Sequence, residues 1–166
     1  MVREYEGKEY IIFDLVRFLD VKSQGHDPLR FAHSMMTHEL SHICIHEAVP
    51  YLNPDALEIS PYRYDLSYLV FDEGFAHFLS LDEDAAQYDF RAMLDKNHKE
   101  SLRLLREAYR ETDPVKQRKY LEEANSGSFQ FGSLCGLLYL AVCREKLAEI
   151  FREGPLHMME GILNQM

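Results

Sequence analysis

Between Pro28 and Pro50 the chain has no glycine or proline, and this stretch contains the pattern His-Glu-x-x-His at residues 38–42. Apolar residues recur along it at helical spacing. Asp27 is a typical helix cap, and proline is tolerated at the first helical position because its missing N–H would have no partner there. The sequence therefore predicts a helix from about Pro28 to about Ala48, with the pattern in its middle.

Two histidines four residues apart lie on one face of a helix, so His38 and His42 could present two imidazoles to a single metal ion. Glu39 is close enough to reach a water on that metal without being a ligand. Two nitrogen donors, a carboxylate base and room for water are what a hydrolytic zinc site needs. The simpler alternative is a buried helix whose histidines fill space or bond to carbonyls. Two histidines at this spacing, with glutamate between them, favour the metal site.

The residue types narrow the choice of a third ligand. Cys44, Cys135 and Cys143 form no Cys-x-x-Cys pair, so a closed thiolate site is not predicted. The longer version of the motif places another histidine six residues after His42, but that position is Ala48. A carboxylate from a second helix remains.

Glu73 offers such a carboxylate, within a helix predicted from about residue 66 to residue 81. The small residues Gly74 and Ala76 flank it, and we expect them to let this helix approach the metal helix closely. His77 lies one turn further on and is an alternative or auxiliary ligand.

The motif at residues 38–42, followed by Asp-Glu-Gly-Phe-Ala at residues 72–76, resembles the gluzincin class of zinc metallopeptidases. The resemblance covers roughly residues 27–82. It implies a zincin-like helical core that binds Zn²⁺ and hydrolyses peptide bonds in a peptide or protein substrate. The implied zinc ligands are His38, His42 and Glu73. The implied general base is Glu39.

A weaker resemblance covers residues 129–139, which are similar to a glycine-punctuated helix of uncharacterised proteins assigned as zinc peptidases. A peptidase of this class also needs a donor for the oxyanion that develops at the scissile carbonyl. Tyr139 is our candidate for this catalytic role, although a tyrosine packed in the core is the simpler interpretation. Further candidates are Tyr62, Tyr64 and His157.

Two more residues are candidates for a role near the predicted metal. Asp72 could bond the free N–H of a ligand histidine, or it could be a helix cap or a first-turn acid. His46, one turn beyond His42, could likewise support a ligand histidine without binding the metal, or it could be an ordinary solvated or core histidine.

The fold class predicted from the whole sequence is mainly α, with α+β as the alternative. Residues 8–18 are apolar and rich in β-formers, which favours a strand or small N-terminal sheet over a short helix. Zincin folds place a strand edge beside the metal to hold extended substrate. A loop is expected over 50–61, and helices over 84–110, 114–123 (capped by Asp113) and 129–152. The last of these helices should end at a break at Gly154-Pro155. Gly132 and Gly136 are expected to pack closely against the helix that contains His38 and His42.

Composition excludes several classes of protein. A chain of 166 residues with 46% hydrophobic residues predicts a single domain, 1–166, with a real core. The net charge of −10 argues against nucleic acid or an anionic membrane as partner. There is no run of eighteen apolar residues and no signal-like N-terminus. Three cysteines without a pairing pattern suit a reducing compartment, so we expect a cytoplasmic protein, and self-association is compatible with its size.

Two other functions use the same residues. The first is a zinc or iron hydrolase of a small molecule, which would lack an extended peptide groove. An open strand edge at residues 8–18 beside the metal would distinguish the peptidase from it. The second is a non-catalytic helical interaction module with a structural or vestigial metal site, for which a closed fourth coordination position would argue.

Overall fold

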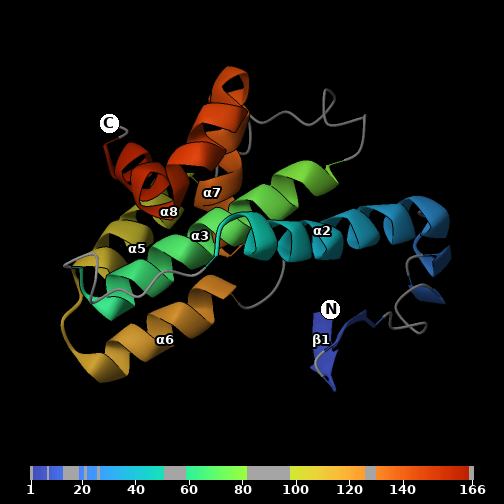
Figure 1. Cartoon of the computed structure of the whole chain (residues 1–166), viewed down its shortest axis with the longest axis horizontal. Coiled ribbons are helices and arrows are strands. Elements are labelled where there is room, and N and C mark those ends of the chain that lie inside the picture. The colour runs from blue at the N-terminus through green and yellow to red at the C-terminus, as the bar shows by residue number, and fades with distance from the viewer. Residues whose placement is uncertain are drawn as a thin grey trace.

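Two long helices, α2 (Pro28–Ala48) and α3 (Pro61–Ser80), run antiparallel beside one another through the middle of the molecule (Figure 1). The computed structural model of the protein describes residues 2–6, 8–12, 19–20, 22–25, 27–50, 59–81, 98–125 and 130–164. Helix dominates these residues, which confirms the mainly α fold class.

Helix α2 has the bounds that the sequence predicts. The side chain of Asp27 caps it, because Oδ1 accepts a hydrogen bond of 2.9 Å from the backbone N–H of Leu29. Pro28 occupies the first turn, where an N–H would have no carbonyl partner within the helix.

Helix α3 begins at Pro61, whereas the sequence predicted a start near Leu66 and a loop through Pro61. The proline lies in the first helical turn, so it starts the helix rather than ending the loop. Contacts with helix α5 (Lys99–Arg110) stabilise the extra turn: the hydroxyl of Tyr62 donates a hydrogen bond of 2.8 Å to the carbonyl of Ala108.

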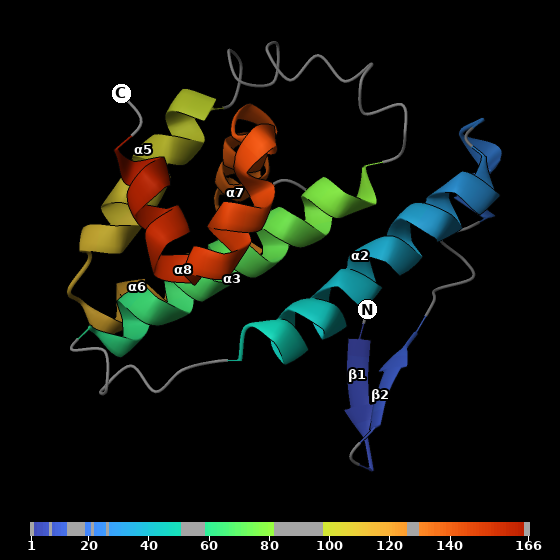
Figure 2. The same cartoon turned by 45° about the horizontal axis from the view of Figure 1, so that its top comes forward.

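Helix α3 is central because it contacts α2 on one side and several helices on the other (Figure 2). Behind it lie α5, α6 (Pro114–Asn125), α7 (Phe131–Val142) and α8 (Leu147–Leu163). Residues 131–140 of α7 are all buried, so this helix forms the middle of the core. Burial against these helices fixes the rotation of α3, and its opposite face is directed to α2.

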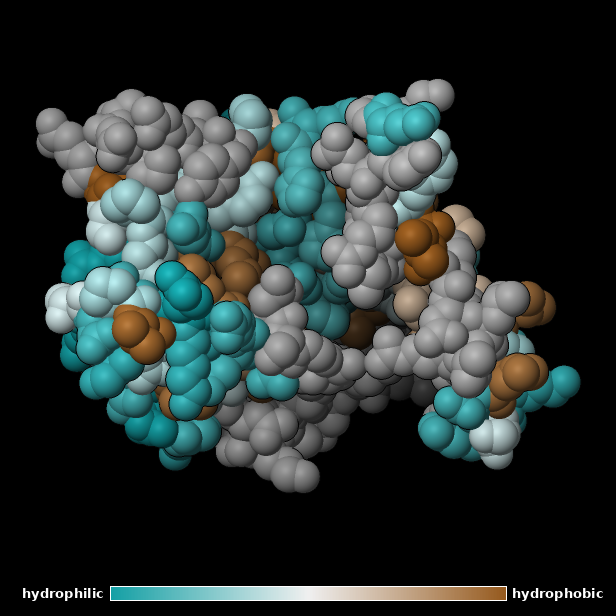
Figure 3. Space-filling model, turned by 90° about the horizontal axis from the view of Figure 1, so that it is seen from below, coloured by the Kyte–Doolittle hydropathy of each residue, from teal (hydrophilic) through white to brown (hydrophobic). Residues whose placement is uncertain are grey.

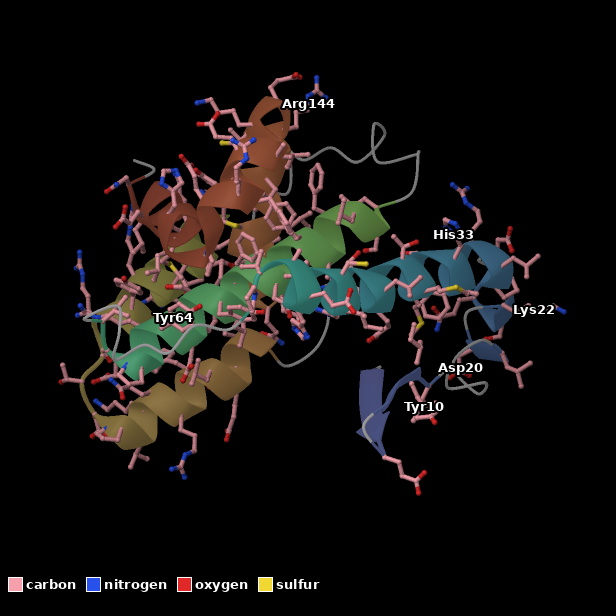
Figure 4. The ribbon with its side chains drawn as sticks, in the orientation of Figure 1. Tyr10, Asp20, Lys22, His33, Tyr64 and Arg144 are labelled. Carbon is pink, nitrogen blue, oxygen red and sulfur yellow. The ribbon has the colours of Figure 1, made fainter. Side chains whose placement is uncertain are left out.

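One helix in the second half of the chain differs from the prediction. The single helix expected over 129–152 is two helices, α7 and α8, separated by Cys143 and a short 3₁₀ turn, η4 (Arg144–Lys146). The three charged residues of this turn are exposed, which an apolar core helix could not accommodate. Figure 4 shows Arg144 directed away from the helices.

Two other predictions in this half are confirmed. Asp113 caps α6, with its Oδ1 accepting from the N–H of Val115 at 2.8 Å. Gly154 has φ of 83° and kinks α8 next to Pro155. Of the helix expected over 84–110, residues 84–97 lie outside the described residues, and the rest contains α5.

The two glycines of α7, Gly132 and Gly136, pack against α3 and α6. The sequence had predicted that they pack against α2, and this prediction was wrong. A Cβ added to Gly74 of α3 would lie 2.8 Å from Cα of Gly136, so the two backbones touch. Gly132 lies against Ala124 of α6 and Leu69 of α3. Gly74 therefore serves the contact between α3 and α7, and the expectation that it lets α3 approach α2 was wrong.

A small antiparallel hairpin precedes the helices. Strands β1 (Val2–Tyr5) and β2 (Lys8–Ile11) pair with Val2 opposite Ile11. The expected N-terminal strand is therefore confirmed over 8–11, while residues 13–18 lie outside the described residues. Among the described elements, neither strand makes an extended contact with a helix, and the hairpin lies to the side of α2 that faces away from the other helices (Figures 1 and 2).

The surface is mostly polar at the end that carries α6, where hydrophilic residues cover the face shown in Figure 3. Within the described residues, no helix is long and apolar enough to cross a membrane.

Candidate metal centre

Hydrogen bonds join α2 and α3 at two levels. At one, the hydroxyl of Ser34 donates to the carbonyl of Ser80 at 2.9 Å. At the other, the hydroxyl of Tyr68 donates to the carbonyl of Val49 at 2.9 Å. A group of histidines and carboxylates fills the surface between them, so this part of the α2–α3 interface is polar and partly buried.

The predicted ligands come together here. His38, His42 and Glu73 each offer one ligand atom, and these three atoms lie within 4.8 Å of one another. The two Nε2 atoms are 3.1 Å apart, and the Glu73 oxygens lie 3.8 Å from His38 Nε2 and 4.0 Å from His42 Nε2. Zn–N bonds of about 2.0–2.1 Å separate tetrahedral ligand atoms by about 3.3–3.4 Å, so only small side-chain shifts are needed to surround an ion.

The two histidines have opposite electrostatic environments. Burial lowers the pKa of His38, and the neighbouring His42 lowers it further, while Glu39 and a backbone hydrogen bond at Ala76 oppose this. Burial also lowers the pKa of His42, but Asp72 and the nearby glutamates outweigh it, so that pKa is raised overall. His38 thus favours the neutral form that a metal ligand needs, whereas His42 has more tendency to hold a proton.

The carboxylates of this group repel one another. Burial raises the pKa of Glu73, and the charges of Asp72 and Glu39 raise it further, although His42 has the opposite effect. Glu39 follows His38 directly in α2, and its charge raises the pKa of both histidines and of Glu73. A divalent cation would relieve this repulsion of negative charges.

Asp72 contacts the second ring nitrogen of His42, Nδ1. Its Oδ2 lies 2.9 Å from His42 Nδ1, a close ion-pair contact without the geometry of a regular hydrogen bond. The same oxygen lies 3.3 Å from Nε2 of His46, and the buried Oδ1 has no hydrogen-bond partner in the described part of the chain. Of the roles that the sequence offered for Asp72, the contact with a candidate ligand histidine is the one that the structure supports.

His77 adds a further histidine to the group. Its Nε2 lies 3.7 Å from Glu73 Oε2, and its ring centroid is 4.6 Å from that of His38. Burial, together with His38 and His42, lowers the pKa of His77 to about 4, so it is neutral at neutral pH. Its spacing of one helical turn from Glu73 was the signal for it in the sequence.

Tyr139 is not brought to this group. It lies on α7 with its hydroxyl against Gly161 of α8, on the other side of α3 from α2 (Figure 2). Its catalytic role stays a prediction without support from this geometry. The other candidate donors also have contacts elsewhere: Tyr62 with Ala108, Tyr64 in the core beside Tyr68, and His157 with Glu153 at 2.8 Å.

The donor set fits zinc. Two imidazoles and one carboxylate, all partly buried, match the ligands of catalytic zinc sites, which leave a fourth position open.

Comparisons of the chain with models of known protein families, with curated proteins and with solved structures found no match.

Proposed function

We propose that the protein is a zinc-dependent metallopeptidase that hydrolyses peptide bonds with Glu39 as general base. The observation that carries the proposal is the convergence of one ligand atom each from His38, His42 and Glu73 within 4.8 Å, on two helices held side by side. Glu39 follows His38 directly in α2, and its charge acts on all three ligands.

Each residue then has a defined task. His38, His42 and Glu73 hold the ion. A zinc ion bound there would lower the pKa of a water molecule and polarise the substrate carbonyl. Glu39 accepts a proton from the attacking water and returns it to the amine as the C–N bond breaks, so the proton count balances over one turnover. Asp72 orients the ring of His42 from its far nitrogen.

Peptide as substrate rests on the resemblance to gluzincins, and one observation favours a smaller substrate. A peptidase of this class would hold its substrate along a strand edge beside the metal. In the described residues, β2 pairs with β1 and makes no extended contact with α2 or α3. A metal-dependent hydrolase of a small molecule is therefore the second candidate, with the same ligands and base.

His77 supports a third candidate, a non-catalytic metal site. Its Nε2, 3.7 Å from Glu73 Oε2, could move to the fourth coordination position and close it. A closed four-ligand site is typical of structural zinc, whereas catalysis needs that position for water or substrate.

The first experiment measures zinc content of protein purified without added metal, beside the variants Glu39→Gln, Glu73→Ala and His38→Ala. We expect about one zinc per chain, kept in Glu39→Gln and lost or weakened in the two ligand variants. Turnover of a peptide library should disappear in Glu39→Gln. Normal turnover by that variant would remove Glu39 from the mechanism, and unchanged zinc in His38→Ala would contradict the ligand assignment.

Cobalt substitution of the wild type and of His77→Ala tests the closed site. For an open catalytic site we expect His77→Ala to leave the visible Co²⁺ spectrum nearly unchanged, and small anions to change it in both proteins. A spectrum that changes on His77→Ala, and that responds to anions only in the variant, would make His77 a ligand and the site structural.

We place this activity in the cytoplasm. The three cysteines are all free, as expected in a reducing compartment. Export of the tagged protein to an oxidising compartment of the host cell would contradict this assignment.

A further inference from the structure

A second group of metal-binding side chains adjoins the first. His42, His46 and Asp72 each offer one ligand atom, and these atoms also lie within 4.8 Å of one another. Asp72 Oδ2 is central to them, at 2.9 Å from His42 Nδ1 and 3.3 Å from His46 Nε2. The group uses Nδ1 of His42, while the first group uses Nε2 of the same ring.

We propose that His46, Asp72 and Nδ1 of His42 form a second site for a divalent cation, which binds zinc or Cu²⁺ when that ion is in excess. Two imidazole nitrogens and a carboxylate suit both ions. His46 is 48% exposed while the Asp72 side chain is 14% exposed, so a cation can enter from solvent and reach a carboxylate that is largely buried.

The orphaned oxygen of Asp72 is a second, independent indication. Oδ1 is buried and has no hydrogen-bond partner in the described part of the chain, while Oδ2 faces two histidines. A buried carboxylate oxygen without a partner loses much of its hydration energy. A cation bound by this carboxylate would compensate both oxygens at once.

Sharing His42 makes the second site weaker than the first. Neutral imidazole has one nitrogen lone pair free for a metal, so binding at both nitrogens requires loss of the remaining N–H proton. The N–H bond breaks, a nitrogen–metal bond forms, and the proton goes to the buffer. The two cations also repel one another across the ring. We expect the second dissociation constant to be larger than the first by about tenfold or more.

This inference rests on the metal-binding part of the proposed function and does not require hydrolysis. The test counts bound zinc by titration at neutral to slightly alkaline pH, with the wild type and His46→Gln. A first-site variant combines His38→Gln with Glu73→Gln. His33→Gln is the matched control, because His33 lies on the same helix, is exposed, and is labelled at the far end of α2 in Figure 4.

We expect two zinc ions per chain in the wild type and in His33→Gln, and one in each of the other two proteins. One ion in the wild type that is unaffected by His46→Gln would overturn the second site and leave the proposed function intact. One ion that is lost in His46→Gln but kept in the first-site variant would support the second site and overturn the proposed function. Circular dichroism of each variant confirms that lost binding is not lost folding.

Loading with Cu²⁺ tests whether His42 is shared. Two copper ions joined by one deprotonated imidazole couple magnetically, so the paramagnetic resonance signal at two ions per chain should be weaker than twice the signal of His46→Gln at one. Two full, independent signals would overturn the shared ligand.

Discussion

Asp72 Oδ2 lies 2.9 Å from Nδ1 of His42, while Nε2 of that ring faces His38 and Glu73. Two consecutive acidic residues of α3, Asp72 and Glu73, thus lie beside different ring nitrogens of His42. In the proposed metal site, Glu73 would share a cation with this histidine, and Asp72 would hold the ring in the orientation that this requires. The cost is a raised pKa at His42, because the same carboxylate also stabilises the protonated ring.

Replacing Asp72 with asparagine should lower zinc affinity at the first site. The variant keeps the size of the side chain but removes the charge that orients His42, and losses of about 10–100-fold are typical of such outer partners. Competition with a zinc-specific dye measures the change. Asp65→Asn, on the same helix, should bind zinc as the wild type does. Equal affinity of the two variants would contradict the role of Asp72.

Zinc affinity should fall as the pH is lowered. Metal binding needs the unprotonated ring of His42, and its pKa is raised above 6.5, so a proton competes with zinc already near neutral pH. The pKa of His38 is lowered, so a proton on His38 should compete with zinc only at more acidic pH. Between about pH 8 and about pH 6 we expect the dissociation constant to rise by up to about tenfold per pH unit for each competing proton. Titrations in buffers of different ionisation enthalpy measure the released protons, and a constant affinity would contradict the assignment.

Gly136→Ala should destabilise the fold. The added methyl group would meet the backbone of Gly74 and Val70 in α3, neither of which can move without separating α3 from α7. Overpacking of this kind costs about 1–3 kcal/mol in the free energy of unfolding, which urea denaturation measures. Val142→Ala is the control, because Val142 lies on the same helix at 60% exposure and should change stability by no more than about 0.5 kcal/mol. If the two variants have the same stability, the contact of the two glycines is not tight.

The three cysteines should react with a thiol reagent in a defined order. Cys44 is exposed and should react first, and Cys143, which is partly buried, should follow. Burial raises the pKa of Cys135 to about 12, so its reactive thiolate is scarce as well as inaccessible. We expect it to react only when the protein unfolds, which mass spectrometry of labelled peptides can follow. Early labelling of Cys135 in folded protein would contradict its place in the core.

Local signals in the sequence were enough for much of the fold. Asp27 and Pro28 predict the start of α2, and Asp113 predicts the start of α6, because caps and first-turn prolines act on neighbouring backbone groups. Equally local signals misled at two points. Pro61 starts α3 instead of closing a loop, and the exposed charges at residues 144–146 divide a helix that apolar composition alone had made continuous.

The sequence by itself determined that His38 and His42 share a helix face, because spacing of one turn is a property of the helix alone, and it placed Glu39 next to His38. It also supplied Glu73 and His77 as candidates on a second helix. Only the tertiary structure decided which of these side chains meet. The burial of α3 against α7 at Gly74 and Gly136 sets its rotation, and that rotation directs Asp72, Glu73 and His77 towards α2 while leaving Tyr139 in the core behind it. Such contacts depend on packing between residues far apart in the chain, which no local pattern encodes.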